Sequence, residues 1–216
     1  MQRSTYMRRA VAALLASTLL ATAAAHAQTP RDMRQCETRT QAIAAAMDVD
    51  ARRTRVWYWA WMAAGTALLA GQATLAALVR GNDRVELAAG AATSVFIPGF
   101  LLLHPPSVLG DSVALDDRMD TTTVGGVLGD ACIALERARE LLARDAADEA
   151  FATGFVAHAF VVGGNIAVGL FLGLAFHDWW GAAKQAVGGS AVGELQILTL
   201  PAGALRAKGI GFEGSF

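Results

Sequence analysis

The chain has 216 residues, of which 54% are hydrophobic and 17% are charged, and its formal net charge is −1. A mean hydropathy of +0.38 is too high for an ordinary soluble domain, so we expect a membrane protein. The basic side chains are scattered and are outnumbered by acidic ones, which argues against a nucleic-acid partner.

Residues 1–27 have the pattern of a removable signal peptide. Three arginines precede an alanine- and leucine-rich run, and Ala25-His26-Ala27 has the small-x-small form of a cleavage site. A retained N-terminal anchor is the alternative, although the run is short for a membrane span. In either case residue 28 begins on the outer side of a bacterial inner membrane.

Four stretches have the length and apolar character of membrane spans. Val56 to Val79 and Thr153 to Phe176 lack charged side chains and exceed the ~20 residues that cross the hydrocarbon core as a helix. Val85 to His104 and Ala182 to Gly203 each contain charges, but the short connection after each strong span requires a returning one. A β-barrel does not fit, because these spans are continuously apolar.

Each predicted hairpin is preceded by a helical segment outside the membrane. Residues 31–55 contain neither Pro nor Gly, and Asp130 to Ala150 has one apolar and one charged face. The expected fold is therefore all-α, with four transmembrane helices as two parallel-related helical hairpins and two extramembrane helices preceding spans 1 and 3. The expected segments are a periplasmic helix at 28–55, hairpin 1 at 56–104, a periplasmic acidic loop and helix at 105–152, hairpin 2 at 153–203 and an extended C-terminal tail at 204–216.

The order helix, span, tight turn, span occurs twice. An offset of about 96–99 residues aligns Cys36 with Cys132 and Pro105 with Pro201, which favours an internal repeat over chance similarity. Both hairpins would then have the same orientation, related by an axis along the membrane normal.

The two cysteines are spaced equally from the membrane. Cys36 lies 20 residues before Val56, and Cys132 lies 21 before Thr153. If both helices are straight, each thiol stands roughly 30 Å above the membrane, on its oxidising side. We therefore predict a Cys36–Cys132 disulfide; the alternative is two unlinked small residues in a helix seam.

The orientation conflicts with the positive-inside rule at one place. Arg52, Arg53 and Arg55 would lie outside, directly against the first span. The signal peptide decides the orientation, because the reverse topology would leave it on the wrong side.

Each predicted span offers one polar side chain near the midplane, namely Thr66, Ser94, Asn165 and Glu194. In one interpretation Glu194 is protonated, hydrogen-bonds Asn165 and fixes the register of the bundle. In the other it carries protons or binds a cation or a polar head group. Asn165 also begins a stripe with Gly169 and Gly173 that should form a packing face.

Signs of catalysis are weak. The histidines do not cluster in the sequence, no metal-ligand spacing or nucleotide-binding motif occurs, and no cofactor is predicted. Ser190 and His158 could in principle act as a nucleophile and base, but counting residues along the spans places them at different depths.

The stretch Asp178 to Pro201 contains "GELQILTLP". It resembles the C-terminal part of uncharacterised bacterial membrane proteins with a G-E-x-Q-I-x-T-x-P signature. The resemblance covers about the last quarter of the chain and implies a bacterial envelope protein without implying an activity.

These observations favour a non-catalytic scaffold or accessory subunit of an envelope complex in the inner membrane, with lipids and envelope proteins as partners. The alternative is a small transporter, or a lipid- or ion-binding protein, that uses the polar midplane residues. A membrane enzyme is the third class.

Overall fold

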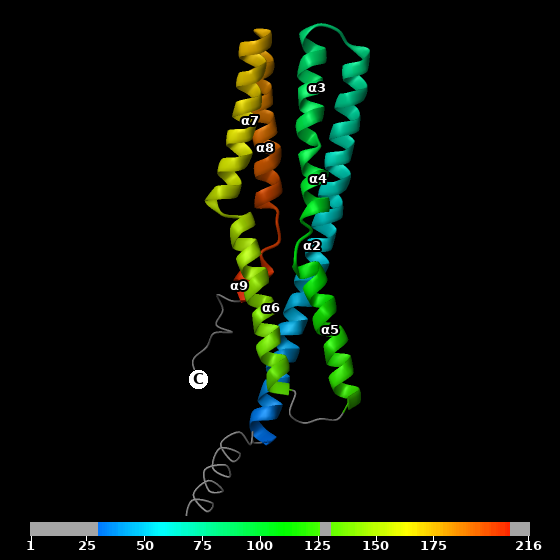
Figure 1. Ribbon diagram of the computed structural model, residues 1–216, viewed down its shortest axis with the longest axis vertical. Helices are drawn as coiled ribbons and strands as arrows, with labels where there is room; N and C mark the ends of the chain where they lie inside the picture. Colours follow the sequence, from blue (N-terminus) through cyan, green and yellow to red (C-terminus); the bar gives the residue numbers. More distant parts are fainter. Residues whose placement is uncertain (1–29, 126–130, 208–216) are drawn as a thin grey trace, which may run out of the picture.

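The computed structural model describes residues 30–125 and 131–207, and every regular element in these ranges is an α-helix (Figure 1). The predicted signal peptide and most of the predicted C-terminal tail lie outside these ranges. The helices are α2 (Pro30–Leu78), α3 (Asn82–Ser94), α4 (Phe96–Leu103), α5 (Val108–Gly125), α6 (Ala131–Ala152), α7 (Phe155–Phe176), α8 (Trp179–Leu198) and α9 (Gly203–Ala207).

The longest helix, α2, is continuous for 49 residues, or about 74 Å. Its buried positions Thr40, Ile43, Met47, Asp50 and Thr54 follow the alternating 3–4 spacing that keeps one stripe facing a partner helix. The partner is α6, on which Leu135, Ala138, Leu142, Asp145 and Glu149 repeat the same spacing. Each stripe therefore forms one side of a long helix–helix seam.

The two helices run parallel from the same end. A disulfide joins Cys36 of α2 to Cys132 of α6, with the two Cα atoms 5.0 Å apart, and confirms the predicted pairing. Farther along, the carboxyls of Asp50 and Glu149 both adjoin the start of α9, at Gly203 and Ala204. The residue offsets of these two pairs, 96 and 99, are almost equal, so the helices stay in register over most of the seam.

Between α6 and α7 the chain bends at Thr153 and Gly154. A Cβ on Gly154 would lie 2.8 Å from the carbonyl oxygen of Ala150, so the close backbone approach requires glycine here. The Thr153 hydroxyl donates to the carbonyl of Glu149 at 2.8 Å and ends α6. The next helix continues from this bend in nearly the same direction (Figure 1).

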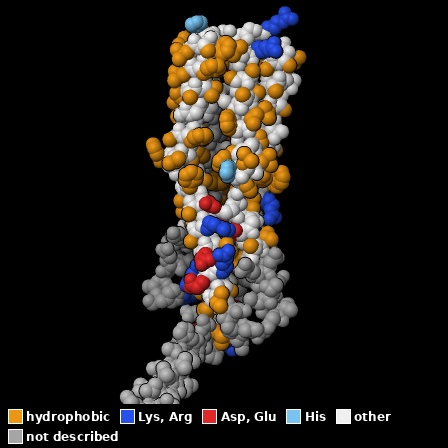
Figure 2. All heavy atoms as spheres, in the orientation of Figure 1, with side chains coloured by type: hydrophobic (Ala, Val, Ile, Leu, Met, Phe, Trp, Pro, Cys, Tyr) orange, Lys and Arg blue, Asp and Glu red, His pale blue; other side chains and the backbone are white. Residues whose placement is uncertain are grey.

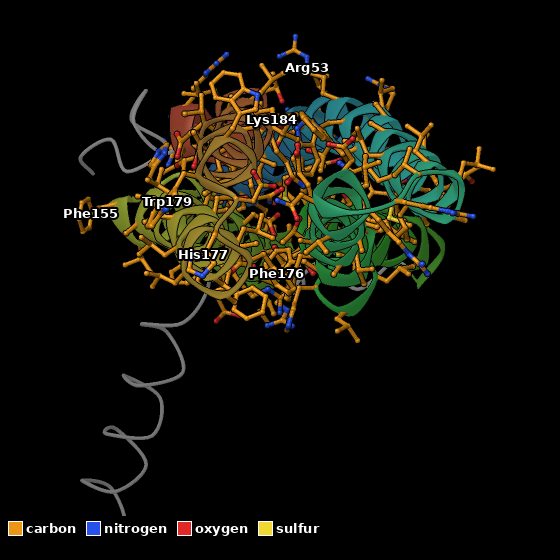
Figure 3. The ribbon with its side chains drawn as sticks, turned by 90° about the horizontal axis from the view of Figure 1, so that it is seen from above. Arg53, Phe155, Phe176, His177, Trp179 and Lys184 are labelled. Carbon is orange, nitrogen blue, oxygen red and sulfur yellow. A yellow bond between two sulfur atoms is a disulfide. The ribbon has the colours of Figure 1, made fainter. Side chains whose placement is uncertain are left out.

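Tight turns reverse the chain after α2 and after α7, as predicted. Gly81 has a φ of 68°, and His177 ends α7 in the left-handed conformation with a φ of 55°. Asp178 then begins α8 by accepting a hydrogen bond from the amide of Gly181 at 2.8 Å. As a result α3 lies against α2, and α8 lies against α7 (Figures 1 and 3).

Two segments differ from the sequence-based expectation. The acidic loop predicted after residue 105 is largely helix α5, and the start of the predicted extended tail is helix α9. Both helices pack against α2 and α6, whose apolar seam gives them a surface to cover. The predicted span Val85 to His104 is divided at Val95, because Pro98 cannot donate a hydrogen bond to Ser94.

The buried core lies at one end of the molecule. It consists mainly of Ile43 and Met47 of α2, Leu115 of α5, five residues of α6, and Ala204 and Ala207 of α9. We call this end, residues 30–55 of α2 with α5, α6 and α9, the stalk. The rest of α2 with α3, α4, α7 and α8 is called the apolar half.

The apolar half exposes large hydrophobic side chains, as Figure 2 shows. Phe155 is 85% exposed and points away from the helices (Figure 3), and Leu103 and Phe160 are similarly exposed. Among the described residues, three helical segments are long and apolar enough to cross a membrane: Arg31–Leu78, Asn82–Asp116 and Ala131–Phe176. The chain is therefore consistent with a membrane protein, and α8, which carries Lys184, Gln185 and Glu194, is not among the three.

Candidate functional site

The α7–α8 seam is built from glycines that allow close contact. A Cβ on Gly169 would lie 2.7 Å from the carbonyl oxygen of Ala182, and one on Gly173 would lie 2.6 Å from the ring of Trp179. On α8, Gly189 contacts Asn165 and Gly193 contacts Val161 in the same way. The stripe predicted from Asn165 to Gly173 is therefore at this interface.

Glu194 contacts His158 and not Asn165, contrary to the predicted hydrogen bond. The Nδ1 atom of His158 and the Oε2 atom of Glu194 are 2.6 Å apart, and Oε1 of Glu194 is buried without a partner. The predicted span ran to Gly203, but α8 ends at Leu198, so Glu194 lies only four residues before the end of the helix. It is therefore level with the first turn of α7 and not with the middle of the bundle.

The same contact brings His158 nearer to the level of Ser190 than residue counting along the spans predicted, but the two stay about one helical turn apart. Ser190 lies one helical turn before Glu194, and its Oγ atom is buried without a hydrogen-bond partner. His158, Glu194 and Ser190 thus belong to one part of the α7–α8 pair, although no hydrogen bond links the serine to the histidine.

A different set of residues forms the polar contact across the apolar half. Ser94 donates to Gln72 of α2 at 2.8 Å. Gln185 of α8 donates to Thr93 of α3 at 3.1 Å and to Asn165 of α7 at 3.3 Å. We call Gln72, Ser94, Thr93, Gln185 and Asn165 the polar chain. The pair Ser94–Gln72 and the trio Thr93–Gln185–Asn165 are connected because residues 93 and 94 are consecutive.

Of the four predicted midplane residues, Ser94 and Asn165 belong to the polar chain. Thr66 is exposed on the outer face of α2, and Glu194 lies at the end of α8. Gln72 of α2 and Gln185 of α8 occupy the positions that were expected for Thr66 and Glu194. Gln185 lies four residues before Gly189 on the face of α8 that meets Asn165, and this spacing is the sequence signal for its position.

Additional contacts join the two helix pairs at the ends of the apolar half. Lys184 of α8 forms a 2.6 Å ion pair with Glu86 of α3. At the other end, the indole N–H groups of Trp57 and Trp61 both donate to the hydroxyl of Thr199, at 3.2 and 3.1 Å. These contacts hold the pairs together above and below the polar chain.

A second candidate site, which the sequence analysis missed, lies in the stalk. Asp50, Asp111, Asp145 and Glu149 are all buried, with exposed fractions from 1% to 8%. Asp145 accepts a hydrogen bond from Ser107 at 2.8 Å and lies within hydrogen-bonding reach of Asp111, while Arg144 binds Asp111 from the surface with an Nε–Oδ2 distance of 2.9 Å. The four carboxyls therefore form two pairs, Asp111–Asp145 and Asp50–Glu149.

Burial changes the acidity of these carboxyls. It raises the pKa of Asp145 to about 7; the Ser107 hydroxyl opposes the rise and the neighbouring Asp111 adds to it. Burial likewise raises the pKa of Glu149 to about 7, against the lowering effect of the Leu205 amide. Asp145 and Glu149 therefore each hold a proton under conditions in which an exposed carboxyl would not.

The sequence did contain a signal for this site. Asp145 and Glu149 continue the 3–4 spacing of Leu135, Ala138 and Leu142, so they fall on the apolar stripe of α6. The helix was interpreted by its overall division into apolar and charged faces, which hid two acids on the apolar side. Within residues 30–125 and 131–207, no group of three or more His, Cys, Asp or Glu side chains could hold a metal ion.

No protein-family description, curated protein or solved structure matches this chain.

Proposed function

We propose that the chain is a four-span protein of a bacterial inner membrane that acts as a non-catalytic scaffold or accessory subunit of an envelope complex. In this proposal the apolar half lies in lipid, and the stalk projects on the oxidising side. The observation that carries this proposal is the parallel pair of helices α2 and α6, which form the stalk and are joined by a disulfide.

Support for a fourth span comes from the packing of α8. Its Gly189 and Gly193 contact α7 closely, and Gln185 and Lys184 bond to α3. A helix whose polar groups are satisfied by its neighbours can cross a membrane that it would not enter alone. Two hairpins with the same orientation also agree with the near-constant offset of 96 and 99 residues between α2 and α6.

Support for a scaffold comes from the construction of the stalk. A disulfide at its far end, a shared core and α9 at its base leave α2 and α6 little freedom to separate. A rigid stalk of this kind can present a fixed surface to another envelope protein. Its outer faces carry exposed ion pairs such as Arg137–Glu140 and Arg52–Asp48, which suit a polar contact.

The alternative function, a small transporter or lipid- or ion-binding protein, is favoured by the polar chain. It brings uncharged polar side chains from α2, α3, α7 and α8 to one level. Polar groups between membrane helices often mark a pathway or binding site. A small cavity of about 10 Å³ lies in the stalk beside Asp50, away from the polar chain.

Affinity purification in mild detergent with two matched variants separates these functions. A scaffold predicts that partner recovery falls for Cys36→Ser/Cys132→Ser and is retained for Gln185→Leu/Asn165→Leu. A transporter predicts the opposite pattern, together with loss of a co-purifying lipid or small molecule from the second variant. Recovery of a bound small molecule with no stalk-dependent protein would overturn the scaffold proposal.

A further inference from the structure

The short helix α9 covers an apolar groove of the stalk. Ala204 and Ala207 are buried against Met47 of α2 and Leu142 of α6, and Leu205 packs beside them. The groove would expose apolar side chains if α9 left it. What holds this five-residue helix in place therefore determines whether that surface is covered.

The direct attachment is a carboxyl of α6. Oε1 of Glu149 accepts a hydrogen bond from the Ala204 amide at 3.1 Å, and Oε2 accepts one from the Leu205 amide at 2.8 Å. Asp50 of α2 approaches from the other side and lies so close to Gly203 that a Cβ there would overlap its carboxyl group. Glu149 thus binds the beginning of α9 directly, and Asp50 lies against it.

These two carboxyls are close to each other and shielded from water. Glu149 is 8% exposed and Asp50 is 4% exposed, and the Oδ2 atom of Asp50 is buried without a hydrogen-bond partner. Two ionised carboxylates in such a place would repel each other, with each losing its hydration. The arrangement is stable when the pair shares a proton.

The surrounding charges do not replace that proton. Asp145 lies one turn earlier on α6 and pairs with Asp111 of α5, which Arg144 binds. Arg206 of α9 and Arg53 of α2 are exposed, and Figure 3 shows Arg53 pointing outward. The only titratable side chain of α7 is His158, which is bonded to Glu194. In the described part of the chain, none of these arginines contacts Asp50 or Glu149.

We propose that α9 is a proton-operated cover: it occupies the groove between α2 and α6 while Asp50 and Glu149 share a proton, and it leaves when both carboxyls ionise. The released state hydrates both carboxylates and uncovers an apolar surface on the stalk. Loss of the proton with rising pH therefore favours release, and acidification favours the covered state. This device operates independently of any partner and goes beyond the scaffold role.

Hydrogen exchange of the full chain in detergent micelles tests the cover directly. The amides of Ala204 and Leu205 should lose protection by about tenfold or more between about pH 5.5 and pH 8.5, after correction for the intrinsic pH dependence of exchange. The amides of Leu142 and Ala138 in α6 should keep theirs, because the stalk stays folded.

Two variants make the test specific. Asp50→Asn removes the repulsion while leaving Glu149 to bind the α9 amides, so protection at Ala204 and Leu205 should become nearly independent of pH. Asp145→Asn removes a buried stalk carboxyl that does not touch α9, and it should retain the wild-type dependence. Two results in the wild type would overturn the proposal: equal protection of the Ala204 and Leu205 amides at both pH values, or loss of protection in α6 together with α9.

Discussion

At the scale of single residues, the contact between His158 and Glu194 shows why a carboxylate in an apolar helix should be considered with its neighbours on both helices. Glu194 was noticed because it interrupts an apolar run, but its partner comes from the beginning of α7. The helix end at Leu198 determined that pairing, and the sequence alone had placed the end later.

Replacing His158 by Leu should leave Glu194 with no partner on either oxygen. We expect a loss of about 1–3 kcal/mol in the free energy of unfolding, measured in detergent. The double variant His158→Leu/Glu194→Leu should recover part of this loss, because it removes both polar groups. Equal stability of the single variant and the wild type would show that the contact contributes little.

Buried acids in the stalk predict a dependence of stability on pH. Burial raises the pKa of Asp145 from 3.8 to about 7, so the folded state binds a proton that the unfolded state releases. The stabilisation is therefore complete below about pH 4 and is lost as the pH rises through 7. The unfolding temperature of the stalk should therefore decrease as the pH is raised from about 5 to about 8.

Asp145→Asn provides the matched control for this pH dependence. It removes one ionisable group while still offering an oxygen to the Ser107 hydroxyl, so the stalk should be more stable at pH 8 and depend less on pH. A variant whose unfolding midpoint falls as steeply as that of the wild type would contradict the assignment.

At the scale of elements, the glycines of α7 make a sharp prediction. Gly169→Ala should disturb the α7–α8 seam, because its Cβ would lie 2.7 Å from a backbone oxygen that cannot move aside easily. The expected loss is about 1–3 kcal/mol in unfolding free energy. Gly163→Ala is the control, since no atom lies within 4 Å of its Cβ and it should be neutral or slightly stabilising.

Long apolar helices and tight turns could be predicted from the sequence, because their signals are local. The helical nature of α5 and α9 could not, since α5 is interrupted by several aspartates, α9 has only five residues, and both gain stability by covering the α2–α6 seam. The disulfide could be predicted because equal spacing from the starts of two predicted spans is a simple geometric relation. The acid pairs were not, because they depend on which face of α6 is buried.

At the scale of the whole molecule, the disulfide closes a loop of almost half the chain, with a sequence separation of 96. Cys36→Ser/Cys132→Ser should lower the stability of the stalk by about 2–4 kcal/mol. Wild-type protein treated with a reductant should match the variant, and the variant itself should not respond to the reductant. The wild type and the variant, each with and without reductant, give four samples. Unfolding of the stalk at the same temperature in all four would contradict a stabilising role of the disulfide.

The proposed scaffold role depends most on the position of the stalk relative to the membrane. The arginines near residue 53 lie at the boundary between the stalk and the apolar half, where the positive-inside rule and the proposed signal peptide predict opposite orientations.

Labelling of single cysteines in intact cells with a membrane-impermeant maleimide resolves this, using a Cys36→Ser/Cys132→Ser background. Val49→Cys in the stalk should react from outside, Asp83→Cys in the α2–α3 turn should react only after permeabilisation, and Leu170→Cys within α7 should stay unreacted in both. Reaction of the stalk and turn cysteines from the same side, or rapid reaction of all three, would contradict the account.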